Sequence, residues 1–123
     1  MDLSSSVLIK DNHLAAMDGD VAAAVRRARE LAPADAKVEV ECDTIALVER
    51  AVEAGADIVM LDNMPVHIMK ECVQLVDGRA ILEASGRITL ANVREVADTG
   101  VNWISVGALT HSAPALDLAL DFD

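Results

Sequence analysis

Residues Ala54–Asn63 read AGADIVMLDN, and this stretch carries the signals that decide the fold. Gly55 is typical of a helix end, the branched apolar run Ile58–Leu61 is typical of a buried strand, and two polar residues follow that strand at once. A helix that ends just before a strand, and a strand that ends in polar residues, together make the repeating unit of a parallel β/α protein.

Four further apolar runs of this kind lie before and after the stretch. The five predicted strands are Val7–Ile9, Val38–Val40, Ile58–Leu61, Ala80–Leu82 and Trp103–Val106. The connections between them are too long for hairpins, so we expect parallel strands joined by right-handed crossovers. The predicted class is α/β, with parallel β/α units forming a partial, incomplete TIM-like barrel of about five strands.

Capping signals predict where the connecting helices begin and end. We expect helices from Val21 to Leu31 after an Asp20 N-cap, from near Thr44 to Gly55, from Pro65 onward, and from about Leu90 to Gly100. Glu53–Ile58 and Asp98–Trp103 both place a glycine at a helix end before a strand, which indicates shared turn chemistry. A last short helix is expected after Pro114.

Composition restricts the class of protein. At 123 residues and 53% hydrophobic, the chain suits one domain over residues 1–123, and its formal net charge of −11 argues against nucleic acid and anionic membranes as partners. It has no apolar run of about 20 residues and no signal-peptide pattern at its start, so a cytoplasmic location is expected. Its two cysteines are expected to be reduced.

Polar residues follow each predicted strand, in the segments Lys10–His13, Glu41–Asp43, Asp62–Asn63, Glu83–Gly86 and Gly107–His111. Because the carboxyl ends of parallel strands share one face of a barrel, these segments are expected to meet at a single pocket. A ligand should bind there.

Two carboxylates of this set, Glu41 and Asp62, suit a hydrated divalent cation or the hydroxyl groups of a sugar. The alternative is that they cap the following helices, which is the role we expect of Asp43. Lys10 is expected to meet an anion, supplied either by a ligand or by Asp11.

Glycines after the fourth and fifth strands suit a phosphate cradle. Backbone N–H groups at Ser85, Gly86 and Gly107 can bind a phosphate, although glycine after a strand is also ordinary turn chemistry.

Other polar or reactive side chains are given simpler roles. For His13 and His111 we expect hydrogen bonding rather than metal binding. Cys42 is expected to be a small core residue, and His67 to lie on the surface or in packing contacts.

Six segments, taken in order and spacing, resemble the quinolinate phosphoribosyltransferase family. They are Val7–His13, Val38–Glu41, Ala54–Asp57, Met60–Asn63, Glu83–Gly86 and Ser105–His111. The resemblance runs from about Val7 to Asp121 and covers the later two-thirds of that family's barrel domain.

The resemblance implies an enzyme, a pentosyltransferase of NAD biosynthesis. Its substrates would be quinolinate and phosphoribosyl pyrophosphate, its cofactor Mg²⁺, and its products nicotinate mononucleotide, pyrophosphate and carbon dioxide. It further implies that Lys10 faces the substrate anions, that Glu41 and Asp62 lie near the ribose and magnesium, and that the phosphate pocket is lined by Ser85, Gly86, Gly107 and His111.

This sequence departs from the family pattern in two respects. Arg87 stands where the motif continues with a second glycine, so its cation would either pair with phosphate or block it. The N-terminal domain and first barrel strands, which carry the family's Arg/Lys/His cluster, have no counterpart here. We therefore expect a fragment that is inactive alone and that works as a homodimer or through complementation by the missing part.

Two other classes of protein remain open on the sequence. A noncatalytic β/α binding module would have the same fold and a silent pocket. A receiver domain with Asp62 as phosphoacceptor needs an acidic pair after the first strand and a lysine after the fifth, whereas the first strand ends in Lys10–His13 and no lysine follows Lys70.

Overall fold

A computed structural model describes residues 6–10, 20–105 and 112–114, and these form one sheet with helices between its strands. The strands are β1 (Ser6–Ile9), β2 (Lys37–Cys42), β3 (Ile58–Asp62), β4 (Ile81–Ser85), β5 (Trp103–Ser105) and β6 (Ser112–Pro114). The helices are α2 (Val21–Leu31), α3 (Ile45–Glu53), α4 (Val66–Val76) and α5 (Val93–Ala97).

Strand order follows chain order, from β1 at one edge of the sheet to β6 at the other. The first five strands pair in parallel and β6 pairs antiparallel with β5, so the prediction of five parallel strands is confirmed. Sequential order is that of a β/α barrel, whereas a receiver domain has the order 2-1-3-4-5. The receiver interpretation is therefore wrong.

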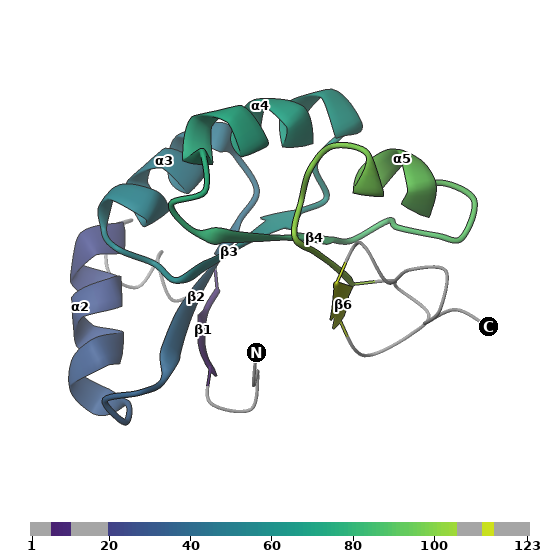
Figure 1. Ribbon diagram of the computed structural model, residues 1–123. Coiled ribbons are helices and arrows are strands. Elements are labelled where there is room, and N and C mark those ends of the chain that lie inside the picture. Colours follow the sequence, from purple (N-terminus) through teal and green to yellow (C-terminus); the bar gives the residue numbers. More distant parts are fainter. Residues whose placement is uncertain (1–5, 11–19, 106–111, 115–123) are drawn as a thin grey trace.

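The four described helices lie on one side of the curved sheet, and β1 and β6 lie at the two ends of the arc (Figure 1). The described strands do not close into a ring, since β1 and β6 are both edge strands. This is the incomplete TIM-like barrel that the sequence predicts.

Alternation along each strand separates a helix-facing side from an inner side. Side chains at every second position are buried against the helices and form the core; those with almost no exposed surface include Val38, Val40, Cys42, Val59, Leu61, Ala84 and Ile104. The intervening positions point to the inner face, away from the helices. Cys42 is thus a core residue, as predicted.

The starts of α2 and α3 agree with the predictions, whereas only one of their two predicted caps is correct. The Asp20 carboxylate accepts the N–H of Ala23 at 3.0 Å, so it caps α2 as expected. The cap of α3 is Thr44, whose Oγ1 accepts the N–H of Leu47, and the prediction that Asp43 is a cap is wrong. Thr44 has the extended backbone that an N-cap needs and lies three residues before the donor.

Two elements differ from the predictions, one in its extent and one in its existence. Helix α5 covers only Val93–Ala97, because the Asn92 side chain accepts the N–H of Thr89 and donates to the Arg87 carbonyl, which holds the preceding residues in a turn. Strand β6 was not predicted, since three residues that end in a proline give no periodic signal. The short helix predicted after Pro114 lies outside the described residues.

The shared turn chemistry before β3 and β5 is confirmed, since Gly55 and Gly100 both take a left-handed backbone, with φ of +89° and +99°. The residue directly before each strand adds a pair of bonds that was not predicted. Asp57 donates its N–H to the Val38 carbonyl and accepts the Val38 N–H on Oδ2, both at 2.9 Å. Asn102 makes the same two bonds with Leu82, also at 2.9 Å. Each polar side chain therefore ties the start of its strand to the preceding strand.

Replacement of Asp57 tests this tie. Asp57→Ala leaves the buried Val38 N–H without an acceptor and is expected to lower the free energy of unfolding by about 1–3 kcal/mol. Asp57→Asn keeps an acceptor, as Asn102 does, and loses only the exposed ion pair with Arg29, so its cost should stay below about 1 kcal/mol. Urea unfolding of both variants is the measurement. Equal losses would mean that the ion pair dominates.

Candidate active site

The carboxyl edge of the inner face holds four of the residues predicted to form the site. Asp62 on β3 pairs in register with Ser85 on β4. Glu41 on β2 pairs with Met60, two positions before Asp62 on the same face. Lys10 directly follows Ile9, whose partner is Val40, and so comes level with Glu41.

These positions are close because adjacent strands lie about 4.8 Å apart. Glu41 and Ser85 are two strands apart and offset by two residues along the strands, so their backbone positions are separated by about 12 Å, which their side chains and a small ligand can bridge. Glu41, Asp62 and Ser85 are half-buried, and Lys10 is exposed. The structure thus brings two carboxylates, a hydroxyl and an ammonium group to one rim.

Neither carboxylate caps the helix that follows it. The side-chain cap of α3 is Thr44, and α4 begins after Pro65 without a side-chain cap bond. Among the described residues, neither side chain therefore has the alternative, capping role, and strand alternation places both on the inner face.

Gly86 allows two loops to approach each other closely. A Cβ built at Gly86 would lie 2.3 Å from Asn63 Oδ1, and its φ of +78° is in the left-handed region. The Asn63 N–H also donates to the Ser85 carbonyl at 2.9 Å. Only glycine meets both demands, so this residue sets how close the β3 and β4 ends can come.

Several candidates fall elsewhere. Gly107, His111, His13 and Asp11 lie outside the described residues. His67 is exposed on α4, as predicted.

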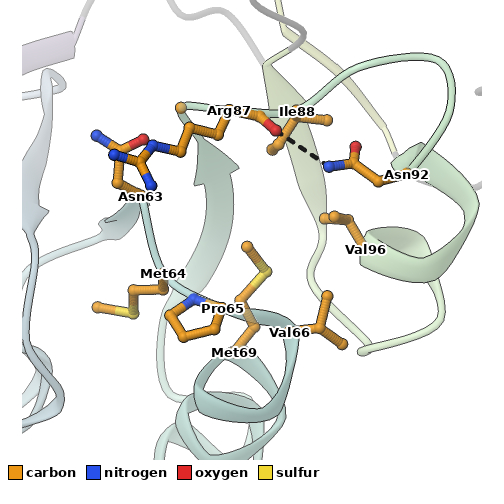
Figure 2. Close-up of a pocket in the computed structure, with 10 residues that line it drawn as sticks. Asn63, Met64, Pro65, Val66, Met69, Arg87, Ile88, Asn92 and Val96 are labelled. Carbon is orange, nitrogen blue, oxygen red and sulfur yellow. Dashed lines mark hydrogen bonds between the residues drawn. The ribbon is translucent and has the colours of Figure 1, made fainter.

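A hollow of about 290 Å³ lies beside the rim, between the β3 and β4 ends and the helices α4 and α5 (Figure 2). It shares only Gly86 with the predicted site, because it opens on the helix side of the strand ends. Its polar residues are Asn63, Arg87 and Asn92, and the rest of the lining is mostly apolar: Met64, Pro65, Val66, Met69, Ile88 and Val96.

Two buried carboxyl groups of the inner face were not among the predicted site residues. Glu39 is 8% exposed and Glu83 is 5% exposed. Ser105 Oγ donates to Glu83 Oε2 at 2.5 Å, Glu39 hydrogen-bonds with Glu83, and Glu39 Oε1 has no partner among the described residues. The alternation Val38-Glu39-Val40-Glu41 was the available signal, because it places both glutamates on one face of a buried strand.

A proton is needed where two carboxyl groups hydrogen-bond to each other. Burial, followed by the hydrogen bond with Glu83 and then by the negative charges of Glu83 and Glu41, raises the pKa of Glu39 from 4.5 to about 8. Glu39 is therefore a neutral acid at pH 7, which reduces the negative charge behind the rim.

The described residues contain no group of three or more His, Cys, Asp or Glu side chains placed to hold a metal ion. None of the described helices is long and apolar enough to cross a membrane.

The architecture and the rim define a class of protein, a parallel β/α half-barrel with its polar residues at the carboxyl ends of the strands. Comparison with known proteins identifies the family to which the chain belongs within this class. Residues 1–121 match the family described as quinolinate phosphoribosyl transferase, C-terminal domain. The chain belongs to this family.

Relatives and solved structures agree with the family. The chain is 40% identical over 119 residues to a probable nicotinate-nucleotide pyrophosphorylase [carboxylating] of Bacillus subtilis, covering 97% of the chain and 41% of the relative. It is 42% identical over 122 residues to the nicotinate-nucleotide pyrophosphorylase [carboxylating] of Homo sapiens, covering 97% and 41%. The solved nicotinate-nucleotide pyrophosphorylase of Francisella tularensis superposes with a TM-score of 0.80 at 38% identity, covering 92% and 40%. The chain thus spans about two-fifths of its relatives' length.

The Glu39 proton predicts a pH-dependent stability. Because its pKa is higher in the folded state, Glu39 stabilises the fold fully below pH 4.5, and this contribution is lost as the pH rises from 4.5 through about 8. The loss is at most about 1.4 kcal/mol per pH unit. Glu39→Gln mimics the neutral acid, so its stability relative to the unchanged chain should rise across this range.

Urea unfolding at pH 5 to 9 measures the difference, with the exposed Glu49→Gln on α3 as the matched control. If Glu39→Gln and Glu49→Gln show the same pH dependence, Glu39 does not hold the extra proton.

Proposed function

We propose that this chain supplies the acidic and phosphate-binding part of a quinolinate phosphoribosyltransferase, a pentosyltransferase of NAD biosynthesis. The observation that carries the proposal is the strand register that gathers Lys10, Glu41, Asp62 and Ser85 at one rim, in a chain of this family. The relatives named above are nicotinate-nucleotide pyrophosphorylases over their full length, so the activity is proposed for the assembled protein.

In the proposed reaction, the quinolinate nitrogen attacks the anomeric carbon of phosphoribosyl pyrophosphate. The bond from that carbon to pyrophosphate breaks, the carboxylate next to the nitrogen leaves as carbon dioxide, and a proton from solvent takes its place on the ring carbon, which gives nicotinate mononucleotide. Lys10 would face the substrate anions. The Ser85–Gly86 turn, together with Gly107 and His111, would hold the phosphate of the ribosyl group.

Glu41 and Asp62 suit the ribose hydroxyls and Mg²⁺. Magnesium keeps several waters and is commonly held by one or two carboxylates together with substrate phosphates, so it does not need the larger all-protein cluster that the described residues lack. These two carboxylates would hold it through water, and the ion would supply positive charge to the pyrophosphate.

Charge indicates that the rest of the site comes from outside these 123 residues. Quinolinate and phosphoribosyl pyrophosphate are both anions, whereas the chain has a net charge of −11 and the described rim has Lys10 and Arg87 as its cations. We therefore propose that residues 1–123 form the C-terminal barrel portion, completed by an N-terminal domain, by the first barrel strands or by a second copy of the chain. The cytoplasmic location predicted from the sequence is part of this proposal.

Complementation tests the activity. The chain is mixed with a separately made segment equivalent to the preceding part of the Bacillus subtilis relative, and formation of nicotinate mononucleotide from the two substrates with Mg²⁺ is followed. Turnover in the mixture, and in neither part alone, is the expected result. A folded mixture in which neither substrate binds nor product forms would contradict the proposal.

Asp62→Asn separates a role in the site from a role in the fold. Loss of this carboxylate should lower turnover of the complemented enzyme by about 10²–10³-fold, because a charge near the reacting ribose and pyrophosphate is removed. Asp98→Asn, at the exposed C-terminal end of α5, is the matched control and should leave turnover unchanged. Equal effects of the two variants would remove Asp62 from the site.

Calorimetric titration of the chain with nicotinate mononucleotide addresses the noncatalytic module. Binding that Asp62→Asn weakens supports a product site at the rim. A product that binds neither the chain nor the complemented mixture would favour the module.

A further inference from the structure

Arg87 occupies a backbone conformation that favours glycine. Its φ is +52°, in the left-handed region, and it follows Gly86, whose φ is +78°. The Asn92 side chain holds this turn by donating to the Arg87 carbonyl at 3.0 Å (Figure 2). A left-handed backbone is costly for a residue with a large side chain. Its presence at Arg87 therefore indicates that the arginine side chain has a role.

The Arg87 side chain is exposed at the strand-end rim and has no hydrogen bond or ion pair with any described residue. In the close-up it extends toward the Asn63 side of the hollow (Figure 2). In a chain with 21 acidic and 10 basic residues, this guanidinium is a cation without a carboxylate within 4.0 Å in the described part.

The backbone beside it also offers hydrogen-bond donors. The N–H groups of Gly86 and Arg87 donate to no acceptor among the described residues, and they follow Ser85 at the end of β4. Successive amides in a turn of this kind form a concave donor surface for an anion.

We propose that Arg87 binds a phosphate monoester, its guanidinium closing over the anion that the Ser85–Gly86 turn receives. Arg87 thereby supplies this chain with a side-chain cation that the family's glycine does not provide. The inference rests on the proposed function and adds a binding residue to it. Guanidinium binds phosphate through two parallel hydrogen bonds, which suits a residue at the rim of the turn.

Geometry favours binding over obstruction. The Arg87 side chain is exposed, so it does not fill the space in front of the Ser85–Gly86 turn. A side chain that blocked the turn would instead fill the space and be buried there.

Amide NMR of the ¹⁵N-labelled chain, titrated with inorganic phosphate and then with nicotinate mononucleotide, tests the proposal. Phosphate should shift the Gly86 and Arg87 amide signals. Arg87→Gln and Arg87→Gly should each weaken phosphate binding about tenfold or more, because a charged hydrogen bond is lost. Arg87→Lys keeps the positive charge but lacks the planar guanidinium that makes two parallel hydrogen bonds, so it should lose less of the phosphate affinity than the other two variants.

The matched control is Arg94→Gln, which removes an exposed arginine from α5 outside the hollow. It should bind phosphate as the unchanged chain does. Arg87→Gly also relieves the backbone strain, so it separates the two possible roles of the arginine. Tighter phosphate binding by Arg87→Gly would show that the arginine blocks the turn, and unchanged binding would show that it has no role; either result overturns the inference.

The two ligands separate this inference from the proposed function. Phosphate binding that depends on Arg87, without binding of nicotinate mononucleotide to the chain or to the complemented mixture, supports the anion site and contradicts the proposed function. Absence of shifts at Gly86 and Arg87 with phosphate overturns the inference, whatever the mononucleotide does.

Discussion

Parallel pairing of β1 to β5 in chain order is the constraint on which the rest of the structure depends. It puts the four described crossover helices on one side of the sheet and the carboxyl ends of these five strands at one edge. Each strand consequently has a helix-facing side made of small aliphatic residues and an inner side free to carry polar groups. The site residues are neighbours because of this register, although Lys10 and Ser85 are 75 positions apart in the sequence.

The two buried carboxyl groups of the inner face, Glu39 and Glu83, are tolerated because they hydrogen-bond to each other. Glu83 accepts from Ser105 and pairs with Glu39, and the buried Glu39 keeps its proton and so avoids an isolated charge. Toward the carboxyl edge, Glu41 and Asp62 are only half-buried and can meet solvent or a ligand. Burial thus separates the acidic inner face into two parts. In the interior the negative charge is reduced by the Glu39 proton, and at the rim the carboxylates can contact a ligand.

Local signals predicted much of this arrangement. The branched runs predicted the five parallel strands, Asp20 predicted the start of α2, and the glycines at two helix ends predicted the shared turns before β3 and β5, although not the bonds of Asp57 and Asn102. Asp43 failed as a cap because Thr44 beside it has the required backbone, a choice that two adjacent capping residues leave open. The pairing of Glu39 with Glu83 joins β2 to β4 across β3, so no local pattern contains it.

The sequence by itself determined the class of fold, the family and the order of the strand-end residues, because periodicity, capping and motif spacing are local properties of a chain. Tertiary structure alone decided which carboxyl groups are buried together, that Gly86 must lie against Asn63, and that Arg87 takes a left-handed backbone with a guanidinium that has no partner among the described residues. These features arise where strands distant in sequence pack against each other. Their energies depend on burial and proximity, which only the folded chain creates.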